Sequence, residues 1–177
     1  MLLKPRNLTL IAVIAASIYV IVSPKERQMN VFLTGYSYWD NTPRASAAIA
    51  RPVIHAQAAG IGTFEDPITL AVGHSIYFGR SFMDFPTGTR FYFPLLRKYA
   101  IVEDLCGDGR TPQNGPCHIG YEGHPWLDIY VDGSEAGNQN ANDCMADITG
   151  IQPAIVNPKR RYRVHAGPIT EGGCQVF

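Results

Sequence analysis

The apolar positions of this chain fall into short runs that proline and glycine separate. The sequence contains 13 prolines and 17 glycines, and the runs between them are rich in Val, Ile, Tyr and Phe. Short β-branched and aromatic runs bounded by turn residues are typical of an all-β domain with long loops. The pattern predicts strands at residues 31–39, 53–57, 68–72, 75–78, 89–93, 99–103, 127–131 and 162–165.

Two of these patterns carry further information. Cys144, Met145 and Ile148 recur at helical spacing, so residues 142–149 are predicted to form a short helix. In the run at 127–131 the apolar residues alternate with Asp128 and Tyr130. Because successive side chains of a strand point to opposite faces, Asp128 is expected on the face opposite the apolar residues.

Residues 1–30 have the pattern of a targeting segment. Lys4 and Arg6 precede an uncharged apolar run of 15 residues at positions 8–22. This length suits the core of a signal peptide better than a full membrane span, which needs about 20 residues. We therefore expect a secreted or extracytoplasmic protein whose first 30 residues are either a cleaved signal peptide or an uncleaved anchor. Residues 31–177 are long enough for one domain.

The distribution of charge argues against a nucleic-acid partner. The formal net charge is zero, but residues 31–177 hold 11 basic and 14 acidic side chains. Nucleic-acid binding depends on a basic surface, which a mildly acidic body does not supply. We expect a monomer that meets a membrane only through its N-terminal segment.

The four cysteines, Cys106, Cys117, Cys144 and Cys174, all follow the targeting segment. An even number in an exported chain favours disulfides, for which three pairings are possible. Short loop closure favours Cys106 with Cys117 and Cys144 with Cys174. The sequence has no Cys-x-x-Cys or His-x-His spacing, so we expect neither a metal site nor a cofactor.

Four segments of the chain carry a further signal. In chain order they are GYSYWD at 35–40, GTFEDPITLA at 62–71, PTGTRFYFP at 86–94 with YAIVED at 99–104, and LDIY at 127–130. Together they resemble the double-psi β-barrels of expansins, family 45 endoglucanases, rare lipoprotein A and the three-aspartate domain of lytic transglycosylases. The resemblance implies a six-stranded double-psi β-barrel with long loops, a short helix and disulfides.

The same resemblance implies candidate catalytic residues. The third and fourth segments match the three-aspartate pattern at Asp104 and Asp128, but Gly73 stands where that family has its third acid. Tyr38-Trp39-Asp40 resembles the first-strand motif of family 45 endoglucanases, whose aspartate is the catalytic base and whose general acid matches Asp128. Asp40 and Asp104 also lie in ordinary turn sequences, and Asp128 could be a solvent-facing strand residue.

Aspartates of this kind suit glycoside cleavage. An acid protonates the leaving oxygen and, in a hydrolase, a second carboxylate activates water or attacks the sugar; a lytic transglycosylase manages with one aspartate. Aromatic rings suit sugar binding because their faces accept the apolar hydrogens of a pyranose. We expect Asp128, assisted by Asp40 and Asp104, to cleave a cell-wall polysaccharide such as peptidoglycan. The alternatives are a non-catalytic wall-binding or wall-loosening module like expansins, and a small disulfide-stabilised effector or inhibitor. The expected binding residues are Tyr36, Tyr38, Trp39, Tyr121, Trp126 and Tyr130.

Overall fold

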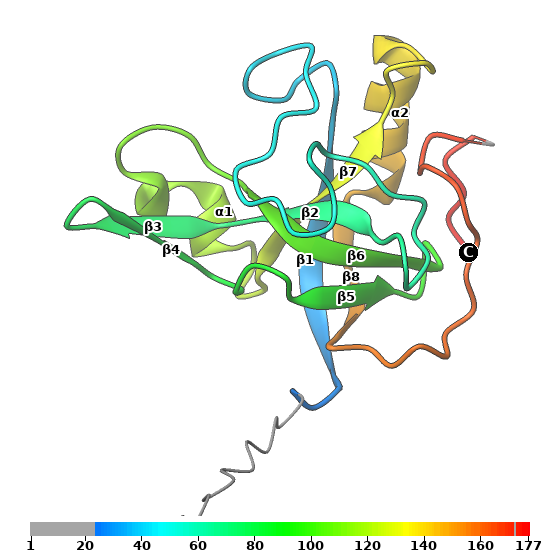
Figure 1. Cartoon of the computed structure of the whole chain (residues 1–177), viewed down its shortest axis with the longest axis horizontal. Helices are drawn as coiled ribbons and strands as arrows, with labels where there is room; N and C mark the ends of the chain where they lie inside the picture. The colour runs from blue at the N-terminus through cyan, green and yellow to red at the C-terminus, as the bar shows by residue number, and fades with distance from the viewer. Residues whose placement is uncertain (1–23, 172) are drawn as a thin grey trace, which may run out of the picture.

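A computed structural model describes residues 24–171 and 173–177, which form a closed barrel of six strands (Figure 1). The order around the barrel is β1, β7, β2, β6, β5 and β8, with β8 pairing back to β1. The predicted apolar run at 8–22 lies outside the described residues. The barrel strands are β1 (Arg27–Ser37), β2 (Ile68–Val72), β5 (Arg90–Phe93), β6 (Lys98–Leu105), β7 (Trp126–Asp132) and β8 (Gly150–Val156).

The barrel mixes parallel and antiparallel pairs. Strands β1 and β7 are parallel, as are β2 and β6, whereas the other four pairs are antiparallel. Two parallel pairs inside a closed six-stranded barrel are consistent with the predicted double-psi arrangement. A hairpin of β3 (His74–Tyr77) and β4 (Arg80–Met83) projects from the barrel directly after β2 (Figure 1).

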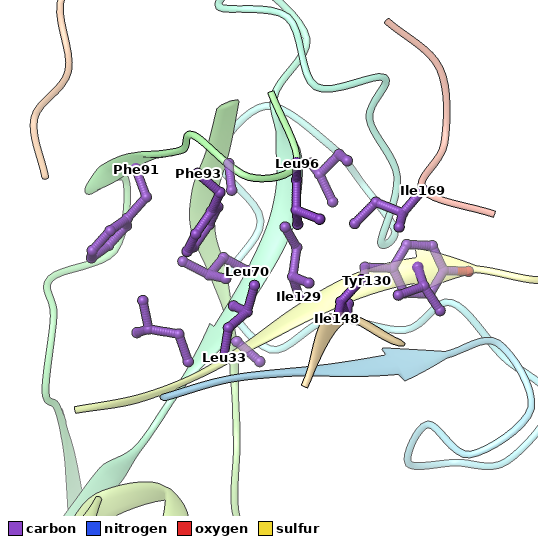
Figure 2. Close-up of a cluster of buried hydrophobic side chains, with 14 of the residues drawn as sticks. Leu33, Leu70, Phe91, Phe93, Leu96, Ile129, Tyr130, Ile148 and Ile169 are labelled. Carbon is purple, nitrogen blue, oxygen red and sulfur yellow. The ribbon is translucent and has the colours of Figure 1, made fainter. Parts of the chain in front are cut away.

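Large apolar side chains from every barrel strand fill the interior (Figure 2). Burial of this apolar surface is the main force that holds the barrel closed. Helix α2 (Asn138–Ile148) packs its buried Ile148 into the same cluster. Among the largest contributors are Leu33, Leu70, Phe91, Phe93, Leu96 and Ile129.

Two disulfides fasten the loops to this barrel. Cys106 pairs with Cys117 in the short helix α1 (Pro116–Ile119), and Cys144 of α2 pairs with Cys174 near the C-terminus. Both predicted pairings are confirmed. Disulfides persist in oxidising surroundings, so the pair indicates an oxidising compartment. Within the described residues no helix is long and apolar enough to cross a membrane.

Two predicted strands are wrong, and in both cases side chains take the backbone hydrogen bonds that a strand would need. The amides of Val53, Ile54 and His55 all donate to the carboxylate of Glu103, so residues 53–57 form a bent loop. The amide of Tyr162 donates to the hydroxyl of Tyr99, so residues 162–165 are also irregular.

Other elements were missed or are longer than predicted. Strand β8 was not predicted. It contains Pro153, which lacks a backbone N–H, and a proline in an apolar run argues against a strand. Strand β4, the 3-10 turn at Pro112–Asn114 and α1 were not predicted, and α2 begins at Asn138 rather than residue 142. Strand β1 begins at Arg27 rather than residue 31, so the last residues of the predicted targeting segment belong to the barrel.

Candidate functional site

The three predicted acids lie in one cleft. Its volume is about 480 Å³, and its lining includes Asp40, Asp104 and Asp128. Asp128 is on β7, Asp104 is near the end of β6, and Asp40 lies in the turn after β1. Two loops, residues 41–50 and 105–109, supply most of the remaining wall. The structure therefore brings together residues that are up to 88 positions apart in the sequence.

Strand register explains how two of the acids come to face each other. Ala71 of β2 pairs with Asp104 on one side and with Asp128 on the other, and Asp128 pairs in turn with Thr34 of β1. Side chains directly opposite one another on neighbouring strands share a face of the sheet. Thr34, Asp128, Ala71 and Asp104 thus form one row. Because adjacent strands are about 4.8 Å apart, the small Ala71 leaves an opening between two acids whose backbones are about 10 Å apart.

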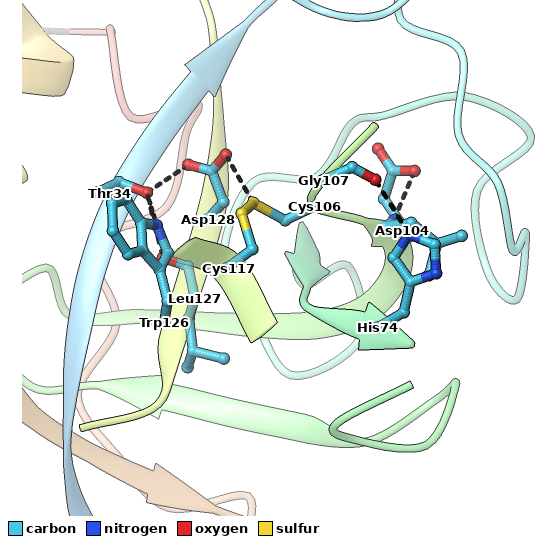
Figure 3. Close-up of a disulfide and its surroundings, with 10 residues drawn as sticks. Thr34, His74, Asp104, Cys106, Gly107, Cys117, Trp126, Leu127 and Asp128 are labelled. Atoms are coloured by element: carbon cyan, nitrogen blue, oxygen red, sulfur yellow. Dashed lines mark hydrogen bonds between the residues drawn. A yellow bond between two sulfur atoms is a disulfide. The ribbon is translucent and has the colours of Figure 1, made fainter. Parts of the chain in front are cut away.

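Asp128 is held by a short chain of hydrogen bonds (Figure 3). Trp126 donates its Nε1–H to Thr34 Oγ1 at 2.7 Å, and Thr34 donates to Asp128 Oδ1 at 2.7 Å. Burial raises the pKa of Asp128 to about 7, and the nearby carboxylates of Asp40 and Asp104 add to this effect. At neutral pH a large fraction of Asp128 therefore keeps its proton, as a general acid requires.

The first disulfide contacts the same carboxyl group. Sγ of Cys106 lies 3.9 Å from Oδ2 of Asp128 (Figure 3). A disulfide sulfur carries no proton and accepts hydrogen bonds only weakly. With Oδ1 accepting from Thr34, the proton of a neutral Asp128 has its place on Oδ2. Because the disulfide sulfur cannot donate a hydrogen bond, it does not stabilise an ionised Oδ2. This is consistent with the raised pKa of Asp128.

Asp104 is the more buried neighbour, with 7% of its surface exposed. Its Oδ1 accepts from the amides of Ala50 and Leu105 at 2.9 and 2.8 Å, and its Oδ2 accepts from the hydroxyl of Tyr36 at 3.1 Å. Burial nevertheless raises the pKa of Asp104 above its usual value. Burial, together with Asp104 and Asp128, raises the pKa of Tyr36 well above its ordinary value, so this hydroxyl stays a donor.

Asp40 combines its place in the cleft with the turn role that its sequence also suggested. Its Oδ1 accepts from the amide and the hydroxyl of Ser37 at 2.7 and 2.8 Å. The side chain is otherwise exposed at the rim. Asp40 therefore fixes the turn after β1 while presenting negative charge to Asp128.

The predicted aromatic residues lie elsewhere. In the described chain only Tyr36 of the six is among the residues that line the cleft. Tyr130 is buried in the core, Trp39 donates to the carbonyl of Gly133, and Tyr38 packs against Trp39. Trp126 and Tyr121 both pack on Phe32, and the indole of Trp126 supports Thr34.

The residues that position the acids were not predicted from the sequence. Thr34 is an ordinary polar position in an alternating strand, and its partner is known only from the register of β1 and β7. His74 is buried at the cleft wall, where Nε2 lies 3.0 Å from the carbonyl of Gly107 and Nδ1 lies 2.8 Å from the hydroxyl of Ser81. A carbonyl only accepts, so Nε2 carries the proton and the ring holds the loop at 107–109 in place.

The structure also explains why residue 73 is a glycine. A Cβ at Gly73 would collide with Oδ2 of Asp84 and with the carbonyl of Cys117. Oδ1 of Asp84 itself lies 2.6 Å from Nδ1 of His118. The space beside the end of β2 is therefore filled by the loop that the first disulfide closes.

A second cluster fixes residues 53–55, which follow the 41–50 loop of the cleft wall. Glu103 is fully buried, and besides the three backbone amides of residues 53–55 its carboxylate meets His55 Nδ1 at 2.7 Å and Thr69 Oγ1 at 3.2 Å. His55 Nε2 lies 2.8 Å from Asp66. Burial lowers the pKa of His55, but the hydrogen bonds to Asp66 and Glu103 outweigh it, and the net pKa is raised. Within the described residues, no group of three or more His, Cys, Asp or Glu side chains could hold a metal ion.

Comparison with known proteins identifies the family. The profile of the DDB_G0273701 N-terminal domain matches residues 28–175, which contain the cleft and all of the barrel except its first residue, Arg27. The chain belongs to this family. It is also 29% identical over 164 residues to the uncharacterized protein DDB_G0273701/DDB_G0273221 of Dictyostelium discoideum. The match covers 90% of this chain but 65% of that relative, so the chain spans less than two thirds of the relative's length. No solved structure matches the chain.

Proposed function

We propose that this chain is an exported protein that cleaves a cell-wall glycan, peptidoglycan or a related polysaccharide, with Asp128 as the general acid. The observation that carries the proposal is the raised pKa of Asp128. Its carboxyl group lines a cleft, has a pKa of about 7 and is oriented by a hydrogen bond from Thr34. A carboxylic acid that keeps its proton near neutral pH is what protonation of a glycosidic oxygen requires.

The sequence resemblance to double-psi barrels of the wall-active families supports the same role. In that resemblance Asp128 matches the acid of family 45 endoglucanases and the closing aspartate of the three-aspartate domain. The topology places it in a mixed six-stranded barrel with two parallel pairs. The two disulfides agree with export.

The surroundings favour a reaction that uses a single acid. Both oxygens of Asp104 accept hydrogen bonds from the protein, and Oδ1 of Asp40 accepts two from Ser37. Asp104 is therefore not as free as a base that activates water should be, and Asp40 has only Oδ2 left for that role. In the single-acid route, Asp128 gives its proton to the bridging oxygen as the C1–O bond breaks. The Asp128 carboxylate then takes a proton from the sugar hydroxyl that attacks C1, which leaves an anhydro end and restores the acid.

The test is digestion of purified peptidoglycan and of β-1,4-glucan by the wild type and by Asp128→Asn, with products identified by mass spectrometry. Loss of a general acid should lower the rate by about 10²–10⁴-fold. Asp147→Asn, on the exposed face of α2, is the matched control and should retain the wild-type rate. Anhydro ends that disappear in Asp128→Asn support the single-acid route, whereas reducing ends that disappear indicate a hydrolase with Asp40 as base.

A non-catalytic, expansin-like role is the second candidate. It is favoured by the observation that Asp40 and Asp104 are both engaged by protein donors, since such a cleft can hold a glycan without activating water. Products from neither protein, together with retention of the wild type on isolated walls, would establish this role and remove the catalytic assignment of Asp128.

A further inference from the structure

Basic side chains gather at the end of the barrel where the described chain begins. Lys25 precedes β1, Arg90 opens β5, and Lys159 to Arg161 follow β8. Two acids lie among them and are already paired. Glu26 is 2.8 Å from Arg161, and Glu65 is 2.7 Å from Arg160. Lys25, Arg90 and Lys159 therefore remain as the cations available to a ligand; we call these three the basic end.

The basic end surrounds a cavity of about 840 Å³. Phe64 is part of its lining. The guanidinium carbons of Arg90 and Arg160 lie 4.6 and 4.8 Å from the centroid of the Phe64 ring. Arg90 is half-buried and donates Nη1 to the carbonyl of Phe64. Among the described residues no carboxylate lies within 4.0 Å of the Arg90 guanidinium or of the ammonium groups of Lys25 and Lys159. A partly desolvated guanidinium that no carboxylate contacts directly favours an anionic ligand, and its planar fork suits phosphate.

The position of this cavity in the chain indicates where the phosphate comes from. Pro24 and Lys25 line it, and the 15-residue apolar run of the sequence ends at residue 22. One residue therefore separates the run from Pro24 in the sequence, and a chain extends by at most about 3.6 Å per residue. If the run stays in a bilayer, the basic end is held at the level of the lipid headgroups. There, cations are attracted to anionic lipid.

We propose that the basic end docks on an anionic membrane, with a phospholipid phosphate entering the cavity between Lys25, Arg90 and Lys159. Strand β1 leads from this end to the turn that carries Asp40. Its 11 residues span about 33 Å at 3.3 Å per step, so the docked barrel presents its cleft away from the membrane. Docking does not depend on the proposed glycan chemistry and is measured separately from it.

The experiment uses the full chain reconstituted into lipid nanodiscs. Hydrogen exchange of amides at residues 88–90 and 157–163 is compared between phosphatidylglycerol and phosphatidylcholine discs, at low salt and at high salt. We expect protection in phosphatidylglycerol discs that high salt removes, because exposed charges are screened. Each basic side chain near an anionic surface contributes about a fivefold factor, so Lys25→Gln/Arg90→Gln/Lys159→Gln should reduce protection by about a hundredfold.

A matched triple variant, Arg44→Gln/Arg80→Gln/Arg110→Gln, removes three exposed cations remote from the basic end and should keep the protection. Equal exchange in the two lipids, or no association with the discs, would overturn the proposal. The salt comparison uses only the wild type, so it decides the question even if a triple variant folds poorly. Inorganic phosphate added to the full chain in detergent is the last arm. Protection by phosphate alone, equal to that of the anionic discs, would mean a free-anion site and not a membrane-docking surface.

Discussion

Asp128 occupies a position that opposes folding whenever its carboxyl group is ionised. Its pKa is about 7 in the folded protein against an ordinary value of 3.8. A raised pKa means that stability is fully present below pH 3.8, falls as the pH rises, and reaches its lower plateau above about pH 7. The shift corresponds to about 4 kcal/mol at that plateau.

Asp128→Asn should therefore stabilise the protein at pH 8 by up to about 4 kcal/mol and change it little at pH 3.5. Urea unfolding at the two pH values measures both differences. The amide of asparagine can still accept from Thr34 and fills a similar volume. Destabilisation at pH 8 would show that the ionised carboxylate is a structural partner, and it would remove the argument that this group is poised to donate a proton.

The raised pKa of His55 predicts a second pH dependence of the folding stability, above pH 6.5. Its pKa is raised above 6.5 because Asp66 and Glu103 hold the protonated ring against the opposing effect of burial. The stabilisation is complete below pH 6.5 and is lost as the pH rises through the folded value. His55→Gln should remove this slope and lower the free energy of unfolding by about 2 kcal/mol at pH 6, because Glu103 loses a buried donor.

The measurement is again urea unfolding, here at pH 6 and pH 8.5, and it is made in the Asp128→Asn background because Asp128 also titrates near pH 7. His118→Gln is the control, since His118 pairs with Asp84 at the surface of the α1 loop and not with the buried Glu103. A slope of the Asp128→Asn protein that persists when His55→Gln is added would assign the titration to another group. A slope that persists only in the control would confirm His55.

At the level of elements, the periodicity of apolar residues predicted the strands that supply the acids. It failed where side chains accept the backbone hydrogen bonds that a neighbouring strand would accept. Strand β2 lies where predicted, and β5, β6 and β7 differ only at their ends. The loop at 53–57 has a strand-like composition, but Glu103 draws its amides into a single carboxylate site. Glu103 is 48 to 50 positions away from these amides, so no local pattern could have revealed the contact.

The two disulfides should contribute differently to the fold and to the cleft. In the chain-entropy account, closing the 30-residue loop between Cys144 and Cys174 is worth about 3.6 kcal/mol, and the 11-residue loop between Cys106 and Cys117 about 2.8 kcal/mol. Paired Cys→Ser variants measured by urea unfolding should lose about these amounts. Only Cys106→Ser/Cys117→Ser should also lower the pKa of Asp128, because a hydroxyl replaces a sulfur beside Oδ2.

Carbon-13 NMR of the Asp128 carboxyl carbon reads that pKa directly in each variant. Cys144→Ser/Cys174→Ser is the internal control, since its sulfurs lie between α2 and the C-terminal segment. An unchanged Asp128 pKa in Cys106→Ser/Cys117→Ser would show that the first disulfide acts on the loop alone and not on the acid.

For the whole molecule, the sequence predicted the class of fold and the three acids but not how they are arranged. Asp40, Asp104 and Asp128 were found by their resemblance to known motifs, and they do share a cleft. The row that places Ala71 between two acids and Thr34 beside Asp128 depends on the order β6, β2, β7 and β1. That order joins strands that are distant in sequence. For the same reason the hydrogen bond from the Trp126 indole to Thr34 was not predicted.

The two ends of the barrel should act independently of each other. The cleft and the basic end are separated by the length of β1, about 33 Å, whereas exposed charges are screened over about 8 Å at physiological salt. Lys25→Gln/Arg90→Gln/Lys159→Gln should therefore cleave a soluble oligosaccharide at the wild-type rate while it loses lipid-dependent protection. Asp128→Asn should lose cleavage and keep the lipid-dependent protection. Loss of cleavage in a folded triple variant, verified by circular dichroism, would mean that the ends are coupled through the barrel, because direct electrostatics cannot act over that distance.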